Sequence, residues 1–563
     1  MTESRRSFLR RHRGLQRVGF ALLAAAAATL CTVSVLLHRS EPYLRARIVQ
    51  ELQDRFHARV ELDGFHVSLA DGLWAEGKGL RIWPPAQVEG VTVPGPVGPG
   101  ASAEPLIRLA EFRFHAPLVY APGRPIHISL VELKGLEVRV PPRSHFGNPA
   151  GTAGAGAQAQ HKLGAGLVSF EVETVECKGA RLVVETSKPG KLPMEFAIAH
   201  LKLTGVAAGG SIGFDAELTN PRPAGAIYTT GRFGALHGSD LGEAPIQGTY
   251  RFEHADLASL KGIAGILHST GRYQGTLREL AVDGETQTPD FRLTHFGNAL
   301  PLTTRFHARV DGTNGDTWLE PVEATLGRSH FWVQGQVVRV TEKDDTGALH
   351  SIGHDIDLKV NVDRGQMADF MRLASRTATP LLTGAVTMKT ALHIPPGPVP
   401  VHERLRLQGS FALDQALFTS DKIQAKLVEL SLRGQGRPQD VKTTDPASVR
   451  SAMHGNFLMG SGVITLPALE FTVPGAAIQL KGAYGLEGGA LDFAGTAKLQ
   501  ATVSQMVGGW KGLLLKPADR FFKKDGAGTS VPIHIGGTRT EPQFGIGLDK
   551  MKGTRPERLG EKP

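Results

Sequence analysis

Alternation of apolar and polar residues is the dominant pattern along this chain. From Ile356 to Val362 every second residue is aliphatic, and the residues between them are charged or carry an amide. Because successive side chains of a strand point to opposite faces, such a segment has one apolar face and one face in water. The same pattern dominates from Leu167 to about Val340 and returns from Ile464 to Ala501. The chain is therefore predicted to be mainly β.

Helical spacing of apolar residues is rare by comparison. It predicts short helices over residues 41–56, 256–267, 367–375 and 504–515. A sheet with one apolar face must cover that face with another layer or with a ligand, and these helices are too few to do so. An open groove and a closed sandwich both fit the alternation. The residues expected to line the apolar face, as candidate lipid contacts, are Ile356, Leu358, Val360, Val362, Leu405, Leu407, Phe411, Leu413, Leu469, Phe471 and Val473.

A short internal echo accompanies the strands. Gln247–Tyr250, Gln408–Phe411 and Lys481–Tyr484 each read polar, glycine, small, aromatic, and Thr230–Phe233 and Thr270–Tyr273 form a second set. Glycine inside a strand usually marks a bulge or a sharp bend where a sheet curls. The echo predicts a long, curled antiparallel sheet built by repetition. Coincidence in a chain with 68 glycines is the alternative.

The segment Val18–Leu37 is apolar throughout and long enough, at ~30 Å as a helix, to cross the hydrocarbon core of a bilayer. Arginine dominates the residues before it, where Glu3 is the one acidic residue. The positive-inside bias predicts a cytoplasmic tail over residues 1–17, a transmembrane anchor over residues 18–37, and export of the remainder. The arginines are Arg5, Arg6, Arg10, Arg11, Arg13 and Arg17.

A cleaved signal peptide is the alternative to an anchor. The alanines at 24–28 match the small-residue cleavage pattern, but they lie inside the apolar run. Cleavage there would leave an apolar region of only six residues before the site, and residues 30–37 would continue the hydrophobicity after it. We therefore expect an uncleaved, single-pass anchor.

Composition removes several classes of function. The net charge is +9, and much of the excess precedes the anchor, so no basic stripe for nucleic acid is expected on the body. The chain has two cysteines, and Cys31 lies in the apolar run, so Cys177 is not expected to form part of a disulfide framework. No nucleic-acid partner is therefore predicted.

A search for catalytic motifs finds one match and one tempting cluster. Gly209–Gly213 fits the G-x-S-x-G pattern around Ser211, but a strand follows it where a nucleophile elbow needs a helix, so a hairpin turn is expected. A hydrolase remains the third hypothesis on that match alone. Asp311–Thr317 is rich in side chains with oxygen atoms that could bind calcium, but Gly315 stands where the third oxygen ligand of a calcium loop belongs. Asn314-Gly315 between two apolar segments instead predicts a hairpin turn.

The histidines are scattered. His350 and His354 are four residues apart and Asp355 follows, but Gly353 argues against a helix that presents both, and a surface loop is expected there. We predict no catalytic residue, no cofactor and no metal, and hence a protein that is not an enzyme.

Short motifs near both ends of the exported chain together resemble those of a known protein family. At the beginning these are an anchor, a short helix, and the segments Val60–Leu62, Phe65–Leu69 and Gly72-Leu73. Near the end they are Gly482–Tyr484, Leu491–Phe493, Val503-Ser504, Lys524–Gly526, Val531–Ile533, Gly537-Thr538 and Pro542–Phe544. This chain resembles the AsmA-like family, most specifically at its two ends and less so in the middle.

The resemblance implies a protein anchored in the inner membrane of a double-membraned bacterium, N-terminus in the cytoplasm and bulk in the periplasm. Related TamB-like and YhdP-like proteins are regarded as curled sheets whose apolar groove conducts lipid acyl chains. The leading hypothesis is thus a non-enzymatic protein of outer-membrane biogenesis that binds or conducts phospholipids. The alternative is an assembly factor for outer-membrane proteins, with other envelope proteins as partners.

The expected organisation follows from these readings. It comprises an N-terminal AsmA-like β region (38–147), a flexible alanine- and glycine-rich linker (148–166), a central β-groove region (167–434), a polar loop (435–456), a C-terminal AsmA-like region (457–550) and a disordered tail (551–563).

Overall fold

The structure is a computed structural model of the 563-residue chain. It describes residues 41–42, 45–46, 48–50, 52–53, 58–68, 73–83, 86–88, 91–93, 104–116, 126–140, 170–186, 188–206, 211–234, 243–260, 262–294, 297–375, 379–486, 488–507, 516, 519 and 528–546. The predicted anchor (18–37), linker (148–166) and C-terminal tail (551–563) lie outside the described residues. Among the helices that are described, none combines the length and the hydropathy needed to cross a bilayer.

One large sheet of 24 strands makes up most of the described chain. Its strands are β1 (Val60–Ser68), β2 (Leu73–Ile82), β5 (Ile107–Ala116), β6 (Ile126–Val140), β7 (Phe170–Val184), β8 (Met194–Val206), β9 (Ile212–Pro221), β10 (Ala224–Phe233), β11 (Pro245–Asp256), β12 (Ile263–Ala264), β13 (Ile266–Thr276), β14 (Glu279–Leu293), β15 (Leu300–Val310), β16 (Thr317–Leu326), β17 (Ser329–Lys343), β18 (Leu349–Gln366), β19 (Leu382–Ile394), β20 (Arg406–Phe418), β21 (Ser451–Gly460), β22 (Val463–Val473), β23 (Ala476–Gly485), β24 (Leu491–Leu499), β25 (Thr529–Gly537) and β26 (Pro542–Ile546).

Strand order follows chain order almost without exception. Each strand pairs with the next one along the chain, apart from the short β12, which pairs with β14 and leaves β11 beside β13. A separate hairpin is formed by β3 (Ala86–Val88) and β4 (Val91–Val93), which leaves β2 beside β5. The pairing is antiparallel except between β6 and β7, which run parallel. The prediction of a mainly β, curled sheet is confirmed, and this one parallel pair departs from the expected antiparallel order.

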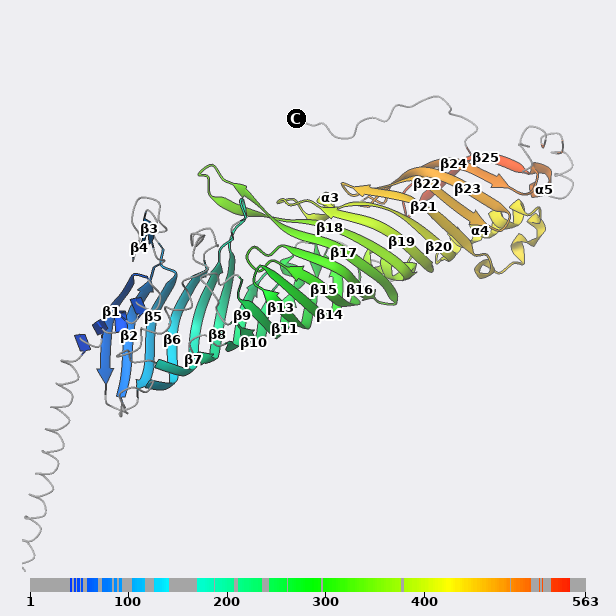
Figure 1. Ribbon diagram of the computed structural model, residues 1–563. Coiled ribbons are helices and arrows are strands. Elements are labelled where there is room, and N and C mark those ends of the chain that lie inside the picture. The colour runs from blue at the N-terminus through cyan, green and yellow to red at the C-terminus, as the bar shows by residue number, and fades with distance from the viewer. Residues whose placement is uncertain are drawn as a thin grey trace, which may run out of the picture.

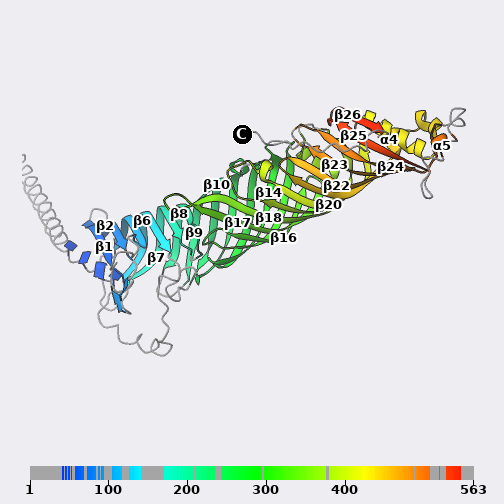
Figure 2. The same cartoon turned by 90° about the horizontal axis from the view of Figure 1, so that it is seen from above.

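The sheet is an elongated, open trough rather than a closed sandwich (Figures 1 and 2). Its N-terminal half bends along a crease, a line at which successive strands carry glycine with φ near +65°: Gly79 in β2, Gly135 in β6 and Gly179 in β7. The registers put these residues at one level, with Ala110 of β5 between the first two. Glycine adopts such a φ without strain, so these three glycines allow the backbone to bend at this level of the sheet.

Bulges bend the second half of the sheet. Register shifts occur in all nine pairings from β14 to β23. Each bulge places an extra residue on one strand and increases the local twist and bend.

Glycines also let aromatic rings lie flat on the apolar face. A Cβ on Gly248 would lie 2.7 Å from the Tyr273 hydroxyl, and one on Gly271 would lie 2.7 Å from the Tyr250 ring. The glycine–aromatic echo in the sequence therefore corresponds to this packing.

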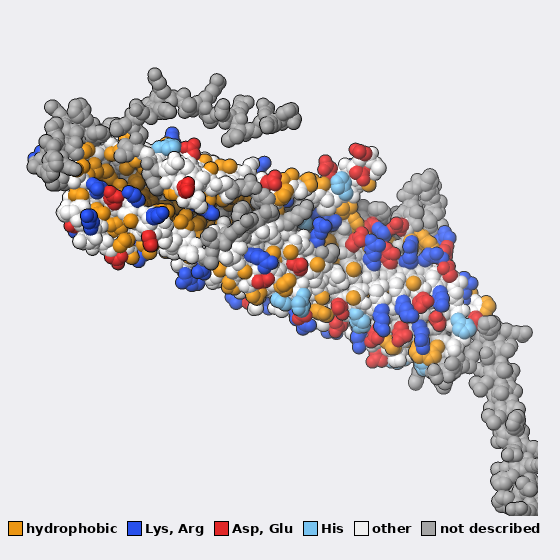
Figure 3. Space-filling view, turned by 180° about the vertical axis from the view of Figure 1, so that it is seen from behind, with side chains coloured by type: hydrophobic (Ala, Val, Ile, Leu, Met, Phe, Trp, Pro, Cys, Tyr) orange, Lys and Arg blue, Asp and Glu red, His pale blue; other side chains and the backbone are white. Residues whose placement is uncertain are grey.

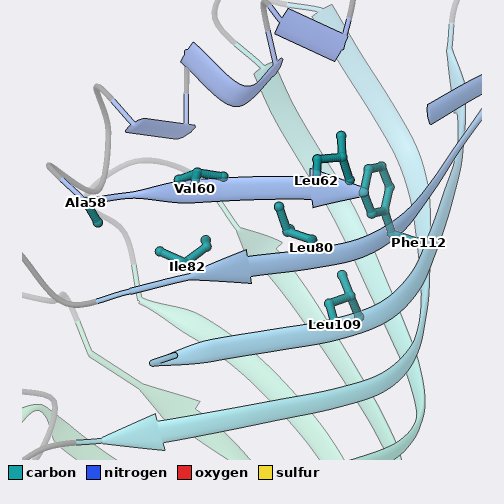
Figure 4. Packing of buried hydrophobic residues seen from close by; sticks show 7 residues of the cluster. All are labelled: Ala58, Val60, Leu62, Leu80, Ile82, Leu109 and Phe112. Carbon is teal, nitrogen blue, oxygen red and sulfur yellow. The ribbon is translucent and has the colours of Figure 1, made fainter. Parts of the chain in front are cut away.

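In the described part of the chain, helices cover the apolar face near the two ends of the sheet and, through one short helix, over part of β19 and β20. At the N-terminal end, described helical residues between 41 and 53 pack Val49 and Leu52 on a cluster of buried residues from β1, β2 and β5. Figure 4 shows that cluster, which contains Ala58, Val60, Leu62, Leu80, Ile82, Leu109 and Phe112. The same helix protects the free edge of β1, since Arg45 donates to the carbonyl of Leu62 and Glu41 accepts from the amide of Val67.

The C-terminal end is covered by α4 (Asp421–Gly434) and the short α5 (Val503–Val507). Leu427 and Leu430 of α4 and Met506 of α5 pack on buried residues of β22, β23 and β24. Between them, α2 (Met367–Leu373) covers part of β19 and β20. The remaining helical pieces are α3 (Val401–Arg404), η4 (Leu257–Ser259), η5 (Pro438–Lys442) and η6 (Pro446–Ser448).

Several expectations need correction. The helix predicted over residues 256–267 is wrong, because the segment holds only η4 and the strands β12 and the start of β13. The α4 helix was not predicted, although Ile423, Leu427 and Leu430 have helical spacing. Residues 435–456, expected as a polar loop, contain η5, η6 and the beginning of β21. His350 and His354 both lie in β18 rather than in a loop.

The crease yields the first prediction. Replacing Gly179 with alanine adds a Cβ that meets no atom within 4 Å, so its effect comes from the left-handed φ alone. We expect Gly179→Ala to lower the free energy of unfolding by about 1–2 kcal/mol, measured by thermal or urea unfolding. The matched control is Gly460→Ala, since a Cβ there also meets nothing within 4 Å and φ is not left-handed. Equal destabilisation by the two variants would contradict a role for the crease.

Candidate functional site

An unbroken row of apolar residues crosses the concave face from one end of the sheet to the other. Following the registers from β1 to β24, each member is paired with the next, and the row contains no charged residue. Its members are Val67, Ala75, Phe114, Val131, Val175, Leu203, Phe214, Gly231, Gly248, Tyr273, Val282, Ala308, Leu319, Gly335, Leu358, Leu392, Leu407, Met459, Ile464, Tyr484 and Leu491.

Most of these side chains are half-buried, because neighbours on the same sheet cover them while no second layer does. Figure 3 shows hydrophobic side chains gathered in the hollow of the C-terminal half, with charged side chains spread over the outer surface. We name this concave apolar surface the groove. At about 4.8 Å per strand the row extends over on the order of 100 Å, far more than the core of a compact domain requires.

Seven of the eleven sequence-predicted lining residues fall into three parallel rows. Leu358 and Leu407 belong to the long row above. Val362, Phe411 and Leu469 share a second row with Met388 and Leu480. A third row contains Leu413 and Phe471. Outside these rows, Ile356 pairs with Ile394, Val360 pairs with Thr390, and Val473 pairs with Ala476. Leu405 lies just before β20, at the end of α3.

Not all of these positions are open in this structure. Leu413 is completely buried and packs with Met367 and Phe370 of α2. Phe471 and Val473 are buried in the cluster beneath α4. Val362 is buried too, whereas the remaining predicted residues are half-buried: Ile356, Leu358, Val360, Leu405, Leu407, Phe411 and Leu469. The N-terminal members of the long row were not among the predicted residues, because alternation identifies a face but not the register that aligns neighbouring strands.

Two tyrosine hydroxyls on the groove are paired with neighbouring hydroxyl groups. Tyr250 Oη lies 3.1 Å from Ser269 Oγ, and Tyr273 Oη lies 2.7 Å from Thr229 Oγ1. Burial raises the pKa of both tyrosines, and the hydroxyl partners only partly offset it. Both phenols thus stay neutral at physiological pH, and the middle of the groove has no charge from them.

The opposite face is a polar surface with cross-strand ion pairs. In one row Glu76, Arg113 and Glu132 occupy successive strands, and further on Arg272 pairs with Asp283 at 3.1 Å. His330 bridges two strands, with Nδ1 3.0 Å from Asp363 and Nε2 3.1 Å from Glu323. The sheet therefore separates a charged exterior from the apolar groove by a single layer of backbone.

A cleft of about 1000 Å³ lies along β16 to β22. Its lining contains six members of the long row, Leu319, Gly335, Leu358, Leu392, Leu407 and Met459, together with polar residues of the same strands such as Gln334 and Gln336. Beside it, Asp355, Asp357 and His393 are the one group in the described part of the chain that could hold a metal ion. His393 Nδ1 is already 2.7 Å from Asp357 Oδ1, so an ordinary ion pair accounts for this arrangement.

Two motifs from the sequence are resolved as turns. Ser211 lies between the antiparallel strands β8 and β9, with no helix after it, as expected for a hairpin. Asp311–Asp316 connects β15 and β16, and the Asp311 carboxylate accepts hydrogen bonds from the backbone amide and hydroxyl of Thr313 and from Asn314. Because β15 and β16 pair antiparallel across this turn, the hairpin prediction is confirmed.

Comparison with known proteins gives no relative. No family model, curated protein or solved structure matches the chain. The function therefore has to be argued from the groove itself.

His330 gives a prediction about pH. The carboxylate of Asp363, followed by that of Glu323, raises the pKa of His330 above its ordinary value of 6.5. A raised pKa in the folded state stabilises the fold fully below about pH 6.5, and the contribution is lost as pH rises through the raised pKa. We expect His330→Gln to destabilise the protein more at about pH 5.5 than at about pH 8.5 in thermal unfolding. An equal effect at both values would contradict this account.

Proposed function

We propose that this protein binds or conducts phospholipids, with their acyl chains in the groove. The observation that carries the proposal is the apolar row, which is continuous over 21 strands and remains half-exposed between the helices at its ends. Exposed apolar surface of this extent is costly in water, at roughly 25 cal/mol per Å², and normally marks a binding surface. A continuous lining without a charge suits hydrocarbon chains rather than a compact polar ligand.

The surroundings of the groove support the same conclusion. The helices at the two ends leave the middle uncovered, and the charged outer face keeps the sheet soluble while the groove holds an apolar ligand. In line with the resemblance to the AsmA-like family, we propose that the chain is anchored in the inner membrane through residues 18–37, that its body lies in the periplasm, and that it contributes to outer-membrane biogenesis. No catalytic residue, cofactor or metal enters this proposal.

The first test is site-specific photo-crosslinking in the full-length protein. A photoreactive amino acid at Leu358 or Leu407 faces the groove, whereas the next residues, Lys359 and Gln408, face outward on the same strands. We expect phospholipid adducts, detected by mass spectrometry, at the two inward positions and only background at the outward controls. Protein adducts without lipid at the inward positions would favour the assembly-factor alternative and overturn the lipid proposal.

The second test places a charge in the groove. Leu407→Asp puts a carboxylate beside the acyl chains, and a charge in contact with hydrocarbon costs more than about 2 kcal/mol. We expect the phospholipid that co-purifies with the protein to fall by about tenfold or more. Gln408→Asp adds the same charge on the outer face and should leave bound lipid unchanged. If both variants retain lipid equally while remaining folded, the groove is not the binding surface.

A further inference from the structure

The β7–β8 connection reaches a part of the sheet that lies far away in strand order. We name residues 185–186 and 188–194 the strap. Lys188 Nζ lies 2.8 Å from Asp311 Oδ2, and Lys191 Nζ lies 3.0 Å from Asp316 Oδ1. Both carboxylates belong to the β15–β16 turn. Seven strands, β8, β9, β10, β11, β13, β14 and β15, separate the two connections.

The two connections lie on opposite edges of the sheet. Antiparallel strands alternate direction, so the β7–β8, β9–β10 and β14–β15 connections share one long edge, and the β8–β9, β15–β16 and β17–β18 connections share the other. Contact between the strap and the β15–β16 turn therefore joins the two edges. The intervening strands and the strap form a closed ring around the groove. In Figure 1 the long β17–β18 hairpin reaches back towards the end of β8.

Backbone hydrogen bonds reinforce the ion pairs. The amide of Met194 donates to the carbonyl of Thr313 at 3.2 Å, and Arg339 Nη1 donates to the carbonyl of Pro193 at 3.3 Å. Thr341 of β17 donates to the carbonyl of Gly190, and Lys191 donates to the carbonyl of Arg339. The strap thus contacts the β15–β16 turn and β17, along most of its own length.

Burial explains why the contact is firm. Asn314 is completely buried, and the Asp311 and Asp316 side chains are only 7% and 5% exposed. A surface hairpin turn would leave these groups in water. Although burial raises the pKa of Asp311, the hydrogen bonds from Lys188 and Thr313 outweigh it and hold the pKa below its usual value. Without the strap lysines, two carboxylates would remain buried without a cationic partner from this segment, which is strongly unfavourable.

The two long edges of the sheet also come into contact at a second place. Gly262, in the connection between β11 and β12, lies against α3 in the β19–β20 connection: a Cβ on Gly262 would be 3.2 Å from Val401 Cβ. Seven strands, β13 to β19, again separate the two connections. Both contacts therefore join opposite edges of the coiled sheet across seven strands. At the strap, the contact includes two lysine–aspartate ion pairs.

We propose that the strap is a clasp that keeps the middle of the groove closed, so that a lipid passes beneath it lengthwise and cannot enter or leave sideways there. The statement about lipid rests on the proposed function, whereas the closed ring does not. The clasp is a standing part of the fold rather than a gate that opens for each lipid, because its carboxylates are buried and its backbone groups are paired.

The closed ring is tested by a disulfide in the full-length protein. Thr186 Oγ1 and Thr313 Oγ1 are 3.3 Å apart, so Thr186→Cys with Thr313→Cys places two thiols across the edges. We expect rapid disulfide formation under mild oxidation, read by mass spectrometry of the linked peptides. Adding Lys188→Met and Lys191→Met should slow it by about tenfold or more, because the strap can then seat only by leaving two carboxylates buried without their lysine partners. Adding Lys178→Met and Lys202→Met, exposed lysines of β7 and β8, should not slow it.

Lipid passage is tested on the same disulfide variant. Photo-crosslinkers at Val131 and Leu407 report on the groove on the two sides of the ring, since β6 precedes the ring and β20 follows it. We expect equal phospholipid adducts at both positions whether the disulfide is formed or reduced. Loss of adducts at Leu407 on oxidation, restored by reduction, would show a gate and overturn the clasp. Failure of the disulfide to form would overturn the closed ring. Absence of adducts at both positions in the unlocked protein would instead refute the proposed function.

Discussion

The constraint on which this structure depends is that every strand must present its apolar residues to the same side. A shift of one residue in any register would turn the apolar set of that strand outward. The 24 strands avoid this through short connections, strict alternation and bulges that insert an extra residue without changing which face is apolar. Among the described residues no second sheet covers that face, so outside the parts covered by helices the sheet shelters it by curling.

Curling in turn determines where the groove is open and where it is closed. The glycine crease bends β2, β6 and β7 at one level, and bulges do the same for later strands. Continued coiling brings opposite edges together after seven strands, and there the sequence supplies lysines on one edge and aspartates on the other. The ends are closed differently, by a helix on β1 and by α4 over β22 to β24. A local feature, a residue with positive φ or an extra residue in a strand, thus controls the shape of the whole molecule.

The sequence predicts the face of each strand but not the partner of each residue. Leu358 and Leu407 could be assigned to one apolar face from alternation alone, yet their place in a single row with Leu392 depends on two registers. The strap could not be predicted either. From the sequence, Lys188 would be assigned to the surface and Asp311 to an ordinary turn. Only the coiling of the sheet over seven strands brings Lys188 Nζ to 2.8 Å from Asp311 Oδ2. The helix expected at 256–267 failed for a related reason, since strand pairing with β11 and β14 overrides a weak helical spacing.

The position of the strap bears on how a groove of this kind can work. A trough open along its whole length would allow an acyl chain to leave at any point, so transport along it would compete with loss to the surroundings at every strand. Under the proposed function, the closed ring between β8 and β15 would remove that competition in the middle and leave open groove on both sides of it. The cost is that the ring must form correctly during folding, across contacts separated by 125 residues in sequence. In the closed arrangement both buried carboxylates have a lysine partner, so the loss of a lysine is far more costly there than at an exposed ion pair.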